Sequence, residues 1–184
     1  MELTPAQKAA LKAAILASQD AAIVAAATNR NDSELMRLLN LDSAFMVWRS
    51  TTSGDAVMDA ILWERFTPAD TPDGSIIQTN RLLLCQAKQI NLQILLQGRQ
   101  SIATGLLNTR KTLTDALLNV PSGAGGVTQD AGWLGAGRVK VTINRPATVA
   151  ERVFATGTGT AGTPGDLVWE GMLGVNDVGD VMNG

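Results

Sequence analysis

The 184-residue chain contains no histidine, no tyrosine and a single cysteine. Histidine is the residue most often used as a general base and as a transition-metal ligand, so its absence removes the usual basis for either kind of site. A lone cysteine excludes an internal disulfide, and Cys85 lies in an apolar run, which indicates a buried, unreactive thiol in a reducing compartment. We therefore expect no enzymatic activity, no catalytic residue, no metal and no cofactor.

Charge of either sign is also scarce. Fifteen basic residues oppose 17 acidic ones, the formal net charge is −2, and no basic run exceeds two residues. Specific nucleic-acid binding is not expected, because it usually needs a clustered basic surface. No stretch approaches the roughly 20 apolar residues that span a bilayer, and polar residues interrupt the alanine-rich start, so neither a membrane segment nor a signal peptide is expected.

Alanine and glycine are distributed unevenly along the chain. Eleven of the first 28 residues are alanine, whereas 14 of the 18 glycines follow residue 120. Alanine favours helix and glycine favours turns, so the sequence predicts a mainly α protein, a single domain over residues 1–184. Its helical-bundle body covers about 4–120 and 145–155, with long glycine-rich loops or arms at about 121–138 and 156–184 and a short β-strand or hairpin toward the C-terminus.

Capping signals and apolar spacing predict the individual elements. Thr4 and Pro5 begin the first helix, which runs to about Ser18. Helices are expected at about 20–27, 32–39, 53–63, 75–97, 99–107, 112–118 and 146–154. The alternation in residues 139–143 predicts a strand, and residues 67–75 are expected to be a loop. Residues 44–50 form a short apolar run, either extended or leading into the next helix, and a loop is expected there. Residues 174–184 are expected to fray unless a partner holds them.

The strongest helical pattern lies in residues 75–97. Leu83, Ala87, Ile90 and Ile94 are spaced four, three and four apart, which places them along one face. The remaining faces carry glutamine rather than charge. Two interpretations stay open: a polar helix in contact with solvent, or a helix buried against a neighbouring subunit.

Two motifs of possible chemical meaning have simpler interpretations. Gly157, Gly159 and Gly162 match GxGxxG, but the dinucleotide site needs a strand before the glycines and a helix after them, and the expected order here is the reverse. A flexible loop is the better interpretation. The close aspartate pairs fall in turns, helix starts or the tail, where they satisfy local backbone groups.

Four of the seven aromatic residues are tryptophans. Trp63 falls on an apolar helix stripe and is expected in the core. Trp133 and Trp169 lie in glycine-rich segments, where core burial and a role as interface anchor are both open.

Several segments together resemble a family of small structural proteins of tailed bacteriophages and prophages. They are residues 3–15 (LTPAQKAALKAAI), 45–50 (FMVWRS), 109–126, 145–159 (RPATVAERVFATGTG) and 169–171 (WEG). The resemblance extends discontinuously over most of the chain. The region 76–97 is richer in glutamine than the resemblance leads us to expect.

The resemblance implies a non-enzymatic virion protein, a head-to-tail adaptor (connector) that forms an oligomeric ring between portal and tail. It is made in the bacterial host cytoplasm and placed in the virion neck. The implied partners are its own copies, the portal protein and tail or nozzle proteins, with DNA passing through the channel without specific binding and no membrane. The implied interaction residues are Trp48, Arg49, Trp133, Arg145, Arg152 and Trp169.

Two other functions remain as alternatives. One is another neck or tail component, such as a tail-completion, tail or minor capsid protein. The other is a small hydrolase or a regulatory DNA-binding protein, which the lack of histidine and of a basic recognition helix disfavours.

Overall fold

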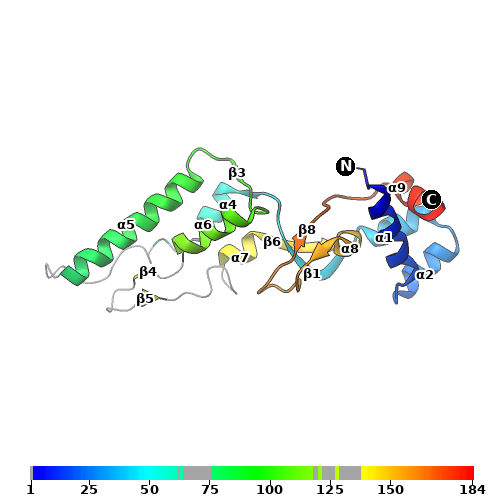
Figure 1. The fold of residues 1–184 in the computed structure, drawn as a ribbon, viewed down its shortest axis with the longest axis horizontal. Helices are drawn as coiled ribbons and strands as arrows, with labels where there is room; N and C mark the ends of the chain where they lie inside the picture. The colour runs from blue at the N-terminus through cyan, green and yellow to red at the C-terminus, as the bar shows by residue number, and fades with distance from the viewer. Residues whose placement is uncertain (1, 62, 64–75, 118–119, 122–126, 129–137) are drawn as a thin grey trace. The chain divides into compact units, whose positions relative to one another are not determined.

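The computed structural model describes residues 2–61, 63, 76–117, 120–121, 127–128 and 138–184 (Figure 1). The expected mainly α fold is confirmed: within these residues the secondary structure is predominantly helical. The helices are α1 (Pro5–Leu16), α2 (Ala21–Thr28), α3 (Asp32–Leu39), α4 (Gly54–Ala60), α5 (Ile76–Leu96), α6 (Leu107–Leu117), α7 (Arg138–Thr142), α8 (Val149–Val153) and α9 (Val175–Asn183).

The strands of the described residues are short and associate in pairs, β1 with β6, β2 with β3, β4 with β5 and β7 with β8. Their bounds are β1 (Asp42–Trp48), β2 (Thr52–Ser53), β3 (Ser101–Ile102), β4 (Val120–Pro121), β5 (Val127–Thr128), β6 (Asn144–Thr148), β7 (Ala155–Thr156) and β8 (Asp166–Leu167).

The chain divides into two compact units. Unit 1 comprises Met1–Val47 and Pro146–Gly184, and unit 2 comprises Trp48–Arg145. The chain leaves unit 1 within β1 and returns to it within β6. Within the described residues, each unit has its own cluster of buried apolar side chains.

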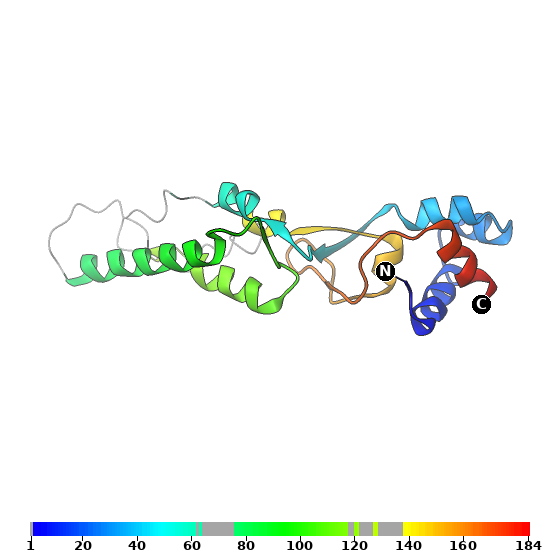
Figure 2. The ribbon, with the colours of Figure 1, turned by 90° about the horizontal axis from the view of Figure 1, so that it is seen from above.

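Unit 1 packs its helices around a core that includes the C-terminal segment. Leu11 and Ile15 of α1 and Leu35 of α3 are buried together with Val178 and Val181 of α9. Figure 2 shows α9 beside α1, and the two helices are in contact. The expectation that residues 174–184 fray was therefore wrong: this segment forms a helix with an apolar face that completes the core.

Capping residues begin the first helices where the sequence predicts. The Thr4 hydroxyl accepts a hydrogen bond from the Gln7 N–H (3.3 Å), and the Gln7 side chain accepts one from the Thr4 N–H (2.9 Å), a capping box. Asp20 Oδ1 accepts from the Ala22 N–H (2.8 Å) at the start of α2. For α3 the N-cap is Asn31, whose side-chain oxygen accepts a hydrogen bond from the Glu34 N–H (3.1 Å).

Unit 2 is built on α5 and α6, which lie side by side (Figure 1). Cys85, Leu92 and Leu96 of α5 pack with Leu113 and Leu117 of α6, all of them buried. Strand β3 occupies part of the segment 99–107 that was expected to be helical, and α6 begins at Leu107, earlier than the expected position 112.

Three expectations from local pattern were wrong, two about secondary structure and one about burial. Residues 44–50 were expected to be a loop, but most of them belong to β1, which pairs with β6. Residues 139–143, expected as a strand, form most of α7, which buries Val139 and Lys140. Trp63, expected in the core, is 36% exposed, and its indole N–H donates to the Met58 carbonyl (3.1 Å).

The glycine-rich segment 156–166 was expected to be a flexible arm and is instead fixed against β1 within unit 1. The Met46 N–H donates to the Gly159 carbonyl (2.7 Å), and the Gly165 N–H donates to the Met46 carbonyl (2.8 Å). The backbone of Gly159 has a φ of 65°, and a side chain there would overlap the Phe45 ring. Glycine is required at this position both for its backbone conformation and for the close approach of Phe45. Most of the other expected arm, 121–138, lies outside the described residues.

Candidate interaction surfaces

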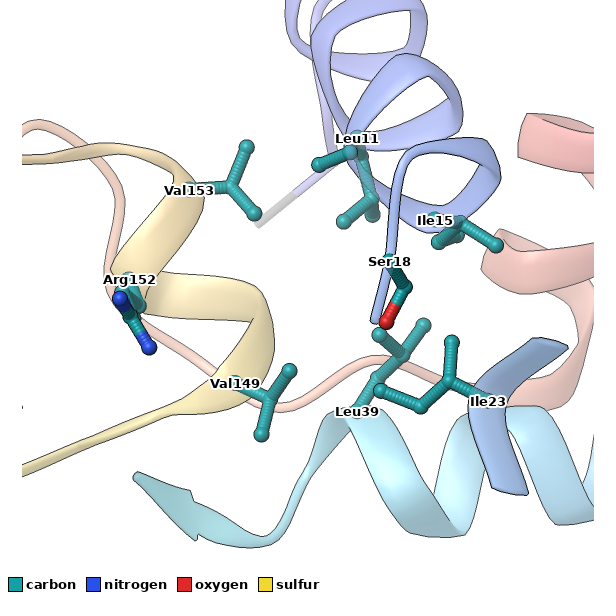
Figure 3. A pocket seen from close by; sticks show the side chains of 9 residues that line it. Leu11, Ile15, Ser18, Ile23, Leu39, Val149, Arg152 and Val153 are labelled. Carbon is teal, nitrogen blue, oxygen red and sulfur yellow. The ribbon is translucent and has the colours of Figure 1, made fainter. Parts of the chain in front are cut away.

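An apolar cavity in unit 1 has one of the predicted interaction residues at its wall. The cavity has a volume of about 490 Å³ and is formed between α1, α3 and α8, as Figure 3 shows. Val149 and Val153 point from α8 toward Leu11 and Leu39. Arg152 lies beside them and is exposed, and within the described residues no hydrogen bond or ion pair holds its guanidinium. The cavity can accept apolar groups with a cation beside them.

Trp169, also predicted as an interaction residue, lies in the core of unit 1. Its ring is 3% exposed and meets the Phe154 ring edge-on, with 5.6 Å between the centroids. The indole N–H is buried and has no hydrogen-bond partner among the described residues. The sequence left core burial and a role as interface anchor open for Trp169. The structure shows core burial.

Glu151 is a residue that sequence reasoning missed, although it connects two segments of the resemblance. Its buried carboxylate accepts hydrogen bonds from the Thr148 N–H (2.9 Å) and the Gly171 N–H (3.1 Å). The Thr148 hydroxyl accepts from the Glu151 N–H (3.1 Å) in return. The spacing Thr148–x–x–Glu151 is the signal of a capping box and could have identified this role. Through Glu151, the start of α8 is tied to residues 169–171.

Trp48 belongs to unit 2, where two cations face its partly buried ring. The Arg110 guanidinium lies 4.8 Å from the ring centroid and the Lys140 ammonium 5.7 Å from it. Arg110 also donates to the carbonyls of Thr104 (3.1 Å) and Gly105 (2.6 Å). Burial lowers the pKa of Lys140. The arrangement positions Trp48 through cation–π contacts within unit 2.

The remaining predicted residues are distributed over different elements. Arg49 follows β1 and is exposed, and its Nε donates to the Asn144 carbonyl (3.0 Å). Arg145 lies in β6 and is partly buried. Trp133 lies outside the described residues. Within unit 2, Trp48 and Arg145 therefore lie on the paired strands β1 and β6, and Arg49 directly follows β1. Arg152 and Trp169 belong to unit 1.

The surface of α5 differs from that of an ordinary solvated helix. Leu83 is 56% exposed, Ile90 52% and Ile94 66%, and Ala87 between them is exposed as well. These are the residues that the sequence predicts along one face, but that face is not the one buried in unit 2. Monomeric soluble proteins rarely expose contiguous apolar patches of this kind, so the face is a candidate interaction surface.

The opposite face of α5 is the one that unit 2 buries. It carries Cys85, Lys88, Leu92 and Leu96, spaced three, four and four apart. The Lys88 ammonium donates to the Asp115 carbonyl of α6 (2.6 Å), and burial lowers its pKa. Burial also raises the pKa of the Cys85 thiol, which agrees with the unreactive cysteine expected from the sequence.

No family model, no curated protein and no solved structure matches the chain. Within the described ranges no three residues among His, Cys, Asp and Glu are grouped to hold a metal ion. Of the helices in those ranges, none alone has the length and apolar content to cross a membrane. Helices α1 and α2 reach that length and apolar content only when they are taken together, and a 112° bend separates them.

Proposed function

We propose that this chain is a non-enzymatic structural subunit of a tailed-bacteriophage virion, and that it acts as a head-to-tail adaptor in an oligomeric ring between portal and tail. The exposed apolar face of α5 carries the proposal. A subunit of a permanent assembly reserves such a face for contact with other chains, whereas an isolated soluble protein gains nothing from exposing it.

Unit 1 supports the same function with two further exposed apolar side chains. Val168 and Met172, the most exposed large apolar side chains of the described residues, flank the buried Trp169 on the segment between β8 and α9. This segment includes the 169–171 part of the resemblance to phage structural proteins. A rigid unit that presents apolar side chains on a fixed segment is suited to contact with another protein.

The experiment that tests the function is to localise the chain in phage particles. Particles produced by the phage or prophage that encodes it should be purified, analysed by mass spectrometry and labelled with an antibody against the chain. We expect the chain in the particles and the label at the neck. A phage that lacks the gene should accumulate DNA-filled heads and separate tails.

Other outcomes identify the alternatives. Label along the tail or on the shell would replace the adaptor by a tail or minor capsid protein. Absence of the chain from purified particles, with normal joining of heads and tails in the deletion, would overturn the virion function altogether.

A further inference from the structure

We propose that the exposed face of α5 is a self-association surface, on which Leu83, Ala87, Ile90 and Ile94 pack against the same face of a second copy of this chain. The proposal rests on the proposed function in that a ring subunit must contact its own copies. It specifies which surface makes the contact.

The first argument is geometric. Side chains three and four apart lie on the same side of a helix, and the spacing of four, three and four continues one stripe from Leu83 to Ile94. The 15 residues from Leu82 to Leu96 are about 22 Å long at 1.5 Å per residue. Within unit 2 the stripe is exposed, because α6 and the rest of the core contact the face that carries Cys85 and Leu92.

The second argument is the absence of exposed charge between Leu82 and Leu96, the part of α5 whose side chains the structure describes throughout. Lys88 is the sole charged residue from Leu82 to Leu96, and its side chain is buried with its ammonium bonded to α6. An exposed helix of a soluble protein normally carries Lys and Glu on its free faces. The exposed residues beside the stripe are instead the amides Gln86, Asn91 and Gln93, together with Leu82 and Leu84.

The third argument identifies the occupant. An amide group both donates and accepts hydrogen bonds, so an apolar stripe bordered by amides is complementary to a copy of itself. A partner of opposite charge would find no charge here to recognise, and a membrane surface is usually bound by a helix with lysine or arginine on its polar face. A second copy of the chain therefore fits this face better than either.

The stripe spans four positions, which is about two heptads, so it is shorter than the stripe of an obligate coiled coil. We expect association that depends on protein concentration. Because the face packs on the same face of its partner, the contact closes a two-fold pair, and any further neighbours in a ring must be bound through other surfaces.

The test is analytical ultracentrifugation of the full chain over a series of concentrations. We expect the weight-average mass to rise above the 19.3 kDa of the monomer as concentration increases. The double variant I90E/I94E should remain at the monomer mass at every concentration. The matched control is L107E, which places a charge on an equally exposed leucine (57%) at the start of α6, and it should associate like the wild type.

A second measurement gives the register of the contact. A87C should form a disulfide-linked dimer under mild oxidation, whereas L107C should not, because Ala87 lies on the stripe and Leu107 does not. Far-ultraviolet circular dichroism of each variant shows whether it has folded.

The outcomes separate this inference from the proposed function. A wild-type chain that stays monomeric at all concentrations, or that binds neutral phosphatidylcholine vesicles through α5, would overturn the inference. The same holds if L107E and I90E/I94E reduce the mass equally. Loss of the virion location with intact α5-dependent association would overturn only the function.

Discussion

The substitution of Gly159 by alanine tests whether the glycine-rich segment 156–166 is fixed against β1 or free. Gly159 has a φ of 65°, a conformation that costs an alanine about 1–2 kcal/mol relative to glycine. The new methyl group would also overlap the Phe45 ring, and overpacking of this kind typically costs about 1–3 kcal/mol. We therefore expect G159A to lower the free energy of unfolding of unit 1 by about 2–5 kcal/mol.

Gly162 provides the matched control in the same segment. A methyl group there meets no atom closer than the Thr160 hydroxyl oxygen at 3.9 Å, an ordinary contact. We expect G162A to change the stability by no more than about 0.5 kcal/mol. If the segment were a free arm, both substitutions would instead leave the stability unchanged, because alanine would reduce the conformational entropy of the folded and unfolded states alike.

The assay is urea unfolding together with hydrogen exchange of peptides that cover 42–48 and 156–166. The Met46 and Gly165 amides, which bond across this contact, should be protected in the wild type and in G162A and should exchange faster in G159A. The variant F45A/G159A should be less destabilised than the sum of the two single variants, because the overlap is removed. Equal stability of G159A and G162A would refute the reasoning.

Two further predictions concern α9 and Cys85. Deletion of residues 174–184 removes Val178 and Val181 from the core of unit 1. We expect that unit 1 then loses its cooperative unfolding transition, measured by circular dichroism. A normal transition would mean that α9 contributes nothing to the stability of unit 1. Burial raises the pKa of Cys85, so at any pH below that value the thiolate fraction is smaller than for a free thiol of pKa about 8.5. Alkylation of the folded chain by iodoacetamide should be much slower than in urea at the same pH; equal rates would contradict the burial.

Helix starts were the best-predicted part of the fold, because their signal is local. Thr4 followed by Pro5, and Asp20 before an alanine run, satisfy backbone N–H groups with side chains only two or three residues away. No information from elsewhere in the chain is needed for these contacts. The same holds for the mainly α character, which follows from composition.

The errors fall where distant contacts decide the outcome. The run Phe45 to Trp48 has no alternation that identifies a strand, and it becomes one because β6, about 100 residues later, pairs with it. In α5 the spacing of Leu83, Ala87, Ile90 and Ile94 was read correctly as one face. Which face meets the core depends on α6, and the core side includes Lys88, a charge that no pattern of apolar spacing would place inside.

The candidate interaction residues lie in different environments. Trp48 and Arg152 lie where they can shape a surface, but Trp169 is a core residue, because Phe154 and Leu173 enclose it in unit 1. Sequence reasoning gave it equal weight for both roles, since glycine-rich surroundings do not reveal whether a core lies nearby. Glu151 was missed because its second partner, the Gly171 N–H, is 20 residues away.

The two crossings between the units make unit 2 an insertion within unit 1. Both halves of unit 1 contribute to one core, and the insert begins and ends on strands that are paired neighbours, about 5 Å apart. An inserted segment whose two ends lie next to each other can be lengthened, shortened or exchanged without changing the fold of the unit that contains it. The sequence of α5 in unit 2 can therefore change during evolution while the cavity, the segment 156–166 and α9 of unit 1 stay as they are.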